Sequence, residues 1–370
     1  MTFLIFVLVL SILIIVHEAG HFLMARKLGV RVEEFALGFG PKIFSWKSGG
    51  TDYRLCAIPL GGYVKMAGDE RDKCQGMTDE FFSKSPGHRA LIALMGPVVN
   101  YALAYFCFVV VFMVGYVDLD ASMKALPAKI GKVMAGSPAE KAGVKVGDTV
   151  VKIGTHAVAG WSVMQDEVMG SGGKTLDMVV ARGQEQVSLK VTPESQISKD
   201  IFGREHPVSR IGVQPDQSQE IDKAFVKRYG VRGAFKKAGQ ELWLVTAKTY
   251  SSLWEIVIGA RSAKEGMTGL IGIFFIIKFA ASVGFAFLLH IIGVISASLA
   301  IFNLLPLIPL DGGHLALLGL EKLRSRPLSP KAEDIITRVG FGLIIVLALF
   351  VFYVDFERIG LIDKVIHFFK

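Results

Sequence analysis

Long apolar runs separated by polar stretches dominate the hydrophobic pattern of this 370-residue chain. A helix needs about 20 apolar residues to cross a bilayer. Four runs provide that length: Thr2–Met24, Leu91–Val117, part of Leu270–Leu310, and Val339–Val354 with its flanks. Between the second and third runs, from about Leu126 to Val213, short β-type segments alternate with Gly and Asp. The pattern predicts an α-helical multi-span membrane protein with four transmembrane helices and an inserted α+β domain.

Composition and charge agree with a membrane protein. The sequence is 52% hydrophobic with a mean hydropathy of +0.48, too apolar for an ordinary soluble protein. The formal net charge is +8, but Lys and Arg are spread along loops. We therefore expect contacts with membrane lipid and none with nucleic acid. Basic residues crowd the loop from Arg26 to Arg89, which predicts a cytoplasmic loop, with both termini and the inserted domain outside.

The first apolar run contains an H-E-x-x-H motif, His17-Glu18-Ala19-Gly20-His21. Residues four apart share one face of a helix, so His17 and His21 can offer two imidazole nitrogens to one metal ion. Zinc is the natural candidate, and Glu18 beside it can act as a general base. A chance pair of histidines is the plainer explanation, but ionisable groups at membrane depth are usually functional.

A third ligand is available at the end of the third run. Asn303–His314 has the sequence N-L-L-P-L-I-P-L-D-G-G-H, in which two prolines break the helix. Asp311 can supply an oxygen ligand, and Asn303 can hold the substrate backbone or an oxyanion. We expect a structural or supporting role for His314. Leu270–Leu310 is longer than one span requires. Two crossings would place Asp311 on the side of the membrane opposite His17 and His21. We therefore predict one crossing, preceded by an interfacial segment.

Two further stretches are candidates for substrate contact. Tyr53–Met66 alternates in polarity, which indicates a strand or short membrane-associated hairpin whose edge can pair with an extended peptide. Its candidate residues are Tyr53, Ile58, Gly61, Gly62 and Tyr63. In the second run, Gly96-Pro97-Val98-Val99-Asn100 places an amide in lipid. Asn100 can approach the metal site or hydrogen-bond between helices. For Tyr53–Met66, the alternative is a hairpin with a purely structural role.

The inserted region has a motif of its own. Gly136-Ser137-Pro138-Ala139-Glu140-Lys141-Ala142-Gly143, followed by Val146–Ile153, resembles bacterial PDZ domains, which bind peptide tails by strand addition. Glu220–Ala263 is amphipathic and is expected along the outer membrane surface or packed on the insertion. The predicted division is a first half of the membrane core at 1–117, a PDZ domain at 118–215, connecting helices at 216–270, and a second half at 271–370.

These motifs together resemble the site-2 protease family of intramembrane zinc metalloproteases. The resemblance implies one zinc ion on His17, His21 and Asp311, with Glu18 as the base and Asn303 and the hairpin on the substrate. It also implies regulated cleavage of single-span proteins, such as anti-sigma-factor-like proteins or remnant signal peptides, in a bacterial inner membrane after a first cut by another protease. The chain departs from the resembled type in two respects. It has one PDZ-like region where two are usual, and it has Ile308 at a position where proline is common.

Two other hypotheses stand beside this one. A membrane-anchored metalloprotease with a water-soluble active site requires the motif on a soluble helix, which the apolar flanks of His17–His21 disfavour. A PDZ-bearing membrane scaffold with vestigial histidines would bind no stoichiometric zinc.

Overall fold

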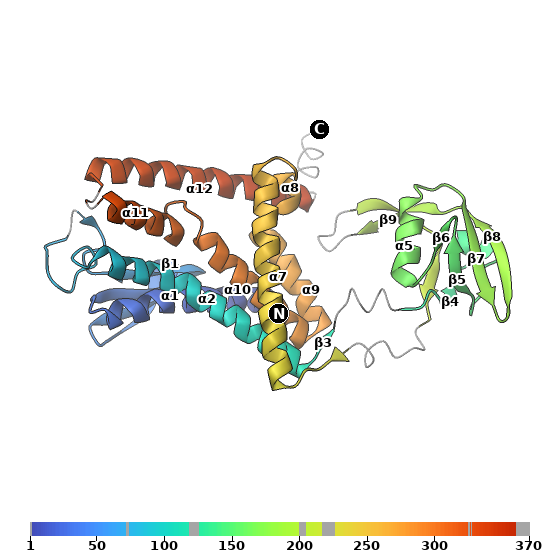
Figure 1. The fold of residues 1–370 in the computed structure, drawn as a ribbon, viewed down its shortest axis with the longest axis horizontal. Helices are drawn as coiled ribbons and strands as arrows, with labels where there is room; N and C mark the ends of the chain where they lie inside the picture. The colour runs from blue at the N-terminus through green and yellow to red at the C-terminus, as the bar shows by residue number, and fades with distance from the viewer. Residues whose placement is uncertain are drawn as a thin grey trace. The chain divides into compact units, whose positions relative to one another are not determined.

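The computed structural model describes residues 2–71, 74–117, 126–199, 205–216, 226–324, 326 and 328–359. They form two compact units. The membrane unit comprises Met1–Phe112 and Gly230–Glu357, and the inserted unit comprises Met113–Tyr229. Long helices make up most of the membrane unit, and short strands most of the inserted unit (Figure 1). Part of the predicted connecting segment, 217–225, and most of the C-terminal tail lie outside the described residues.

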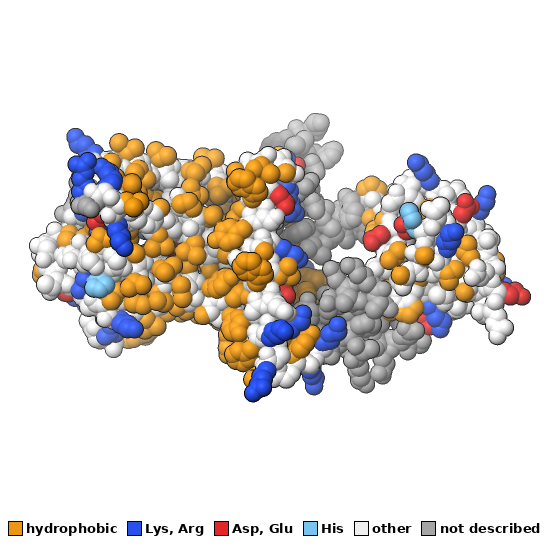
Figure 2. All heavy atoms as spheres, in the orientation of Figure 1, with side chains coloured by type: hydrophobic (Ala, Val, Ile, Leu, Met, Phe, Trp, Pro, Cys, Tyr) orange, Lys and Arg blue, Asp and Glu red, His pale blue; other side chains and the backbone are white. Residues whose placement is uncertain are grey.

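Among the described residues, four helices are long and apolar enough to span a bilayer. They are α1 (Thr2–Lys27), α2 (Pro86–Val114), α10 (Phe285–Asn303) and α12 (Pro330–Arg358). A helix satisfies its own backbone hydrogen bonds, as the water-free bilayer core requires. Apolar side chains cover much of the surface that this unit presents in Figure 2. By length and composition, the prediction of four membrane helices is confirmed.

The long third apolar run is divided between two helices. α9 (Leu270–Val283) has 14 residues, too few to span, and Gly284, at φ +137°, leads into α10. The buried Ile277 of α9 packs with Phe6 and Leu13 of α1. The run therefore contains one helix of spanning length, in agreement with the predicted single crossing.

Most of the charged stretch Glu321–Arg338 is helical. α11 runs from Asp311 to Arg324, and α12 begins at Pro330. Proline is tolerated in the first turn of a helix, where its missing N–H has no intrahelical partner to lose.

A bent sheet lies beside α1 in the membrane unit. It is built from β1 (Val32–Ser48) and β2 (Thr51–Met66). Residues 34–37 of β1 are flanked by 52–55 of β2 on one side and by 62–65 on the other. The stretch expected to form a hairpin or strand is thus one continuous strand, and its partner β1 was not predicted. The arm 62–66, which we call the edge arm, pairs with β1 on one side and, among the described strands, with none on the other.

The inserted unit is built on a sheet with the strand order β6-β5-β7-β8. Its strands are β5 (Thr149–Ile153), β6 (His156–Ala157), β7 (Leu176–Arg182) and β8 (Glu185–Val191). Three smaller strand pairs join β4 (Ile130–Val133) to β11 (Val213–Pro215), β9 (Glu194–Lys199) to β10 (Glu205–Arg210), and β3 (Tyr116–Val117) to β12 (Val226–Lys227). Helices α4 (Pro138–Lys141) and α5 (Trp161–Gly170) complete it, and Trp161, Met164 and Val168 of α5 reach its core.

The amphipathic helix α7 (Val231–Val257) belongs to the membrane unit and is followed by the short α8 (Ala263–Gly266). α7 buries a stripe of Ala234, Ala238 and Leu242. The Thr246 hydroxyl lies 2.6 Å from that of Tyr101 on α2. The opposite face of α7 exposes the large side chains Trp243, Trp254 and Val257. This division of faces fits a helix that packs on α2 and turns an apolar side outward.

Asp148 and Arg182 form an ion pair in the inserted unit. Both guanidinium contacts to the carboxylate are 2.8 Å, and Asp148 is 1% exposed. The guanidinium holds the pKa of Asp148 below its ordinary value. The pairing therefore stabilises the unit fully above about pH 4, and this contribution is lost as the pH falls through the lower, folded-state pKa.

We predict that Asp148→Asn destabilises the inserted unit by about 2 kcal/mol at pH 7, because the charged acceptor of two Arg182 hydrogen bonds becomes a neutral amide with a single acceptor oxygen. Hydrogen exchange of the β5 and β7 amides in the full chain measures this loss. The difference from the unsubstituted chain should shrink toward pH 3. Equal protection in the two chains at pH 7 would show that the ion pair contributes nothing.

Candidate functional site

The candidate site lies where α1 and α2 approach closely. A Cβ at Gly20 of α1 would come within 2.5 Å of the Met95 carbonyl oxygen of α2. In the other direction, a Cβ at Gly96 would overlap the imidazoles of His17 and His21. Small residues allow two helix backbones to approach within a membrane. The two glycines therefore place α2 directly behind the histidine pair.

Three side chains converge in front of that crossing. His17 and His21 are each 8% exposed, and their Nε2 atoms lie 3.2 Å apart. The Asp311 carboxylate faces both rings, with Oδ2 at 3.2 Å from His17 Nε2 and Oδ1 at 3.4 Å from His21 Nε2. Among the described residues, these three form the one cluster of possible ligand atoms with metal-site spacing. The structure thus brings together the three residues predicted as ligands.

The break between α10 and α11 delivers Asp311 to the cluster. α10 ends at Asn303, and α11 begins with Asp311 itself. The two following glycines have no room for a side chain, because a Cβ at Gly312 would overlap the Leu304 backbone and one at Gly313 would lie 2.5 Å from the Ile308 nitrogen. The first turn of α11 is therefore packed against the irregular segment that precedes it.

The spacing of these atoms fits a tetrahedral metal ion. Zinc binds nitrogen and oxygen ligands at about 2.0–2.1 Å, so two ligands of one tetrahedral ion lie about 3.3 Å apart. The two Nε2 atoms are 3.2 Å apart, and each faces a different oxygen of Asp311, at 3.2 Å from His17 and 3.4 Å from His21. One ligand atom from each of the three residues lies within 4.8 Å of the others. Two imidazoles and one carboxylate are also a donor set that zinc accepts while keeping a fourth position for water or substrate. The residues present therefore fit zinc.

Both imidazoles are held from behind by α2. The Nδ1 of His21 lies 2.8 Å from the Ile92 carbonyl oxygen, which can only accept, so Nδ1 carries the proton. In a neutral ring this leaves the Nε2 lone pair directed at His17 and Asp311. The Nδ1 of His17 lies 3.3 Å from the amide of Asn100. Sequence reasoning missed Ile92, since a backbone carbonyl carries no side-chain signal.

Glu18 lies between the histidines and the edge arm of the sheet. It is half-buried and interacts electrostatically with both imidazoles and with Asp311, and its carboxylate accepts a hydrogen bond from the Val64 N–H. A Cβ at Gly62 would lie 3.4 Å from the Glu18 Cγ. The side-chain amide of Asn303 is 3.3 Å from His17 Nε2, on the side where the three ligands meet.

The other predicted substrate residues lie farther along the sheet. Tyr53 packs against Phe22 of α1 and stacks on Trp46, and the Tyr63 hydroxyl donates to Glu34. Gly61, at φ +110°, faces the Phe39 ring, and Ile58 is 51% exposed. Of the five, only Gly62 is placed directly against Glu18 by these contacts.

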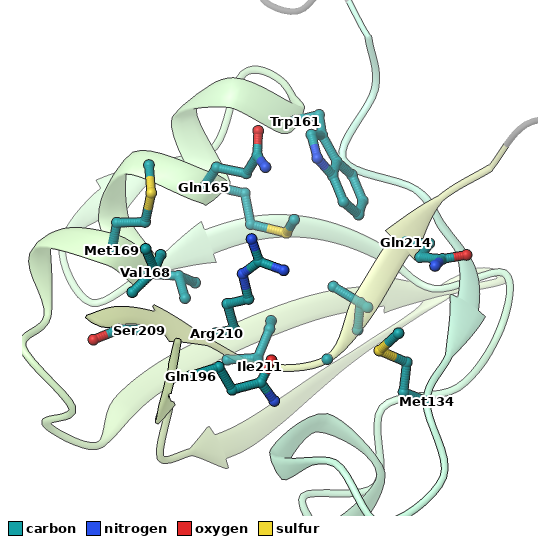
Figure 3. Close-up of a pocket in the computed structure, with 14 residues that line it drawn as sticks. Met134, Trp161, Gln165, Val168, Met169, Gln196, Ser209, Arg210, Ile211 and Gln214 are labelled. Atoms are coloured by element: carbon teal, nitrogen blue, oxygen red, sulfur yellow. The ribbon is translucent and has the colours of Figure 1, made fainter. Parts of the chain in front are cut away.

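The inserted unit contains a groove of about 270 Å³ between α5 and the segment 208–214 (Figure 3). Trp161, Met164 and Val168 of α5 form an apolar wall, and Met134 and Met169 line its exposed margins. Strand β11 pairs with β4 and, among the described strands, with no other, so its second edge is available to an added strand. The groove thus combines an apolar wall with an unpaired strand edge.

Four apolar helices of spanning length, together with a His-His-Asp cluster beside a glutamate, are the arrangement expected of a metal-dependent hydrolase in a membrane. The sequence profile of peptidase family M50 matches residues 5–347. The chain belongs to this family, which confirms the resemblance drawn from its motifs.

Relatives match over nearly the whole chain. A protein of Mesorhizobium japonicum named as a zinc metalloprotease is 32% identical over 366 residues, covering 95% of this chain and 97% of the relative. A similarly named protein of Clostridium acetobutylicum is 33% identical over 346 residues, covering 93% and 94%. Zinc metalloprotease RasP of Oceanobacillus iheyensis is 27% identical over 435 residues, covering 96% and 99%.

The helix crossing generates a steric prediction. Gly96→Ala should destabilise the membrane unit by about 1–3 kcal/mol, because the new methyl group must displace the histidine rings or the helix. Gly87→Ala on the same helix is the matched control, since no heavy atom lies within 4 Å of its added Cβ. Unfolding in a mixed-micelle detergent titration compares the two. Equal stability of both variants would mean that α1 and α2 do not meet at Gly96.

Proposed function

We propose that the chain is a zinc-dependent intramembrane endopeptidase, with one zinc ion held by His17, His21 and Asp311. The observation that carries this proposal is the convergence of two imidazole nitrogens and a carboxylate oxygen, which lie within 4.8 Å of one another, close enough for all three to bind one zinc ion. Membership in a peptidase family and relatives named as zinc metalloproteases support it. A metalloprotease with a water-soluble active site loses support, since the motif lies on an apolar helix of spanning length. A membrane scaffold without activity loses support, since the family is enzymatic.

The chemistry follows from the groups around the cluster. Zinc at this position supplies Lewis acidity, which polarises a peptide carbonyl and lowers the pKa of water to about 7. Glu18 accepts the proton of the attacking water at its carboxylate and passes it to the departing amine. Asn303 donates its amide N–H to the substrate carbonyl oxygen as negative charge develops there. Ile92 keeps the His21 ring oriented throughout.

Substrate access depends on the edge arm. A peptide bond within a transmembrane helix is shielded by helical hydrogen bonds, so the segment must unwind before water can attack it. An unwound segment that pairs with the edge arm regains backbone hydrogen bonds. Gly62 has no side chain to hold this segment away from Glu18, and Tyr63 follows it on the same arm. Gly61, Ile58 and Tyr53 extend the proposed substrate surface along β2.

The proposed substrates are single-span membrane proteins, including anti-sigma-factor-like proteins and remnant signal peptides, after a first cut by another protease. The proposed location is a bacterial inner membrane, with the site toward the cytoplasm and the termini and inserted unit outside. Lys322 and Arg324 in the last turn of α11 support this orientation, since basic residues favour the cytoplasmic side.

For the inserted unit we propose a PDZ-type role in which its groove binds an extended peptide tail. A tail lying along the second edge of β11 would gain backbone hydrogen bonds, and its side chains would reach the apolar wall of α5. This role suits a protease whose substrates present a new chain end after a first cut.

The base assignment predicts the behaviour of Glu18→Gln. The variant should retain stoichiometric zinc, because Glu18 is not a ligand, and should cleave a tagged single-span substrate at least about a hundredfold more slowly. Metal analysis and gel-based cleavage in detergent micelles provide the two readouts. Cleavage at the normal rate would refute the base role of Glu18.

The peptide proposal predicts that a charge on the groove margin weakens binding. Met169→Glu should reduce the affinity of the full chain for a fluorescent peptide with a free carboxyl end by about tenfold. Val146→Glu is the matched control, since Val146 is exposed in the same unit and does not line the groove. Fluorescence anisotropy measures both. Equal affinities would place peptide binding elsewhere.

A further inference from the structure

Two asparagines flank the ring of His17, and they lie on opposite sides of it. Asn303 has its amide nitrogen 3.3 Å from Nε2, on the side of the ligand cluster. Asn100 of α2 has its amide nitrogen 3.3 Å from Nδ1, behind the ring, and is 0% exposed. The sequence groups both as substrate-binding candidates, but substrate at the cluster meets only the side where Asn303 lies.

The position of Asn100 has a consequence for the protonation of His17. A neutral imidazole that gives its Nε2 lone pair to a metal ion carries its proton on Nδ1. That proton needs an acceptor, because an unsatisfied buried donor is costly. The residue within hydrogen-bonding distance of Nδ1 is Asn100, whose Oδ1 is buried and has no hydrogen-bond partner among the described residues. A half-turn of the amide places this oxygen against Nδ1 without moving the helix, since amide oxygen and nitrogen occupy equivalent positions.

We propose that Asn100 is a positioning residue for His17: its amide oxygen accepts the Nδ1–H and thereby directs the Nε2 lone pair at the zinc position. The proposal rests on the proposed function, because it concerns the form of His17 that binds zinc. His21 is held in the same manner by the Ile92 carbonyl, so α2 orients both ligand rings from behind. Such outer partners fix the tautomer and orientation of metal-binding histidines.

The competing explanation is that Asn100 only joins helices. The Ser296 hydroxyl of α10 donates to the backbone carbonyl of Asn100 at 2.8 Å, which links α2 to α10. This bond uses the main chain of Asn100 and survives any substitution of its side chain. The two roles can therefore be separated: the side chain of Asn100 tests positioning, and Ser296 tests the helix contact.

The test compares zinc affinity in three variants of the full chain, measured by chelator competition in detergent. Asn100→Leu removes the acceptor at similar size and should weaken zinc binding about 10- to 100-fold. Asn100→Asp keeps an acceptor and should remain within about tenfold of the unsubstituted chain. Ser296→Ala should leave the affinity unchanged. As a second readout, the visible absorption of the Co²⁺-loaded chain should change in Asn100→Leu and not in Ser296→Ala.

Other outcomes would overturn the inference or its basis. Unchanged zinc affinity and Co²⁺ spectrum in Asn100→Leu would refute the positioning role, as would equal losses in Asn100→Leu, Asn100→Asp and Ser296→Ala. If Asn100→Leu does not fold, Asn100→Ala takes its place with the same expectation. Absence of stoichiometric zinc in the unsubstituted chain would instead refute the proposed function, so the two failures are distinguishable.

Discussion

The structure depends on the close approach of α1 and α2 at Gly20 and Gly96. Only glycine leaves room for the Met95 carbonyl on one helix and for the two imidazoles on the other. Two histidines on a membrane helix would be costly in lipid alone. At this contact, Ile92 and Asn100 of α2 lie within hydrogen-bonding distance of their rings. Their Nε2 atoms are thereby free to face the carboxylate of Asp311.

The remaining parts of the membrane unit complete the environment of that contact. The irregular segment after α10 ends with Asp311 at the first residue of α11, and glycines pack this turn against the segment. The bent sheet places its edge arm along Glu18, so the proposed base lies between the ligand cluster and a strand edge able to pair with substrate. The groups proposed for metal binding, proton transfer and substrate alignment thus meet around His17–His21 of α1.

Much of this arrangement could be predicted from the sequence, because its signals are local or geometric. The i, i+4 spacing placed His17 and His21 on one face, and the parity of crossings required Asp311 to return to their depth. The sheet could only be predicted in part, because β1 pairs with β2 on both sides through bends that alternation does not encode. The orientation of Asn100 behind His17 and the role of the Ile92 carbonyl depend on the helix crossing, which no single stretch of sequence specifies.

The central claim is that His17, His21 and Asp311 share one zinc ion, and X-ray absorption at the zinc edge of the loaded full chain tests it most directly. The account predicts low-atomic-number scatterers at about 2.0–2.1 Å, including two imidazoles, with no sulfur. In Asp311→Ala the zinc should be lost or its oxygen contribution reduced, while both imidazoles persist in whatever zinc remains. A spectrum that is identical in the two chains, or that contains sulfur ligands, would contradict the account.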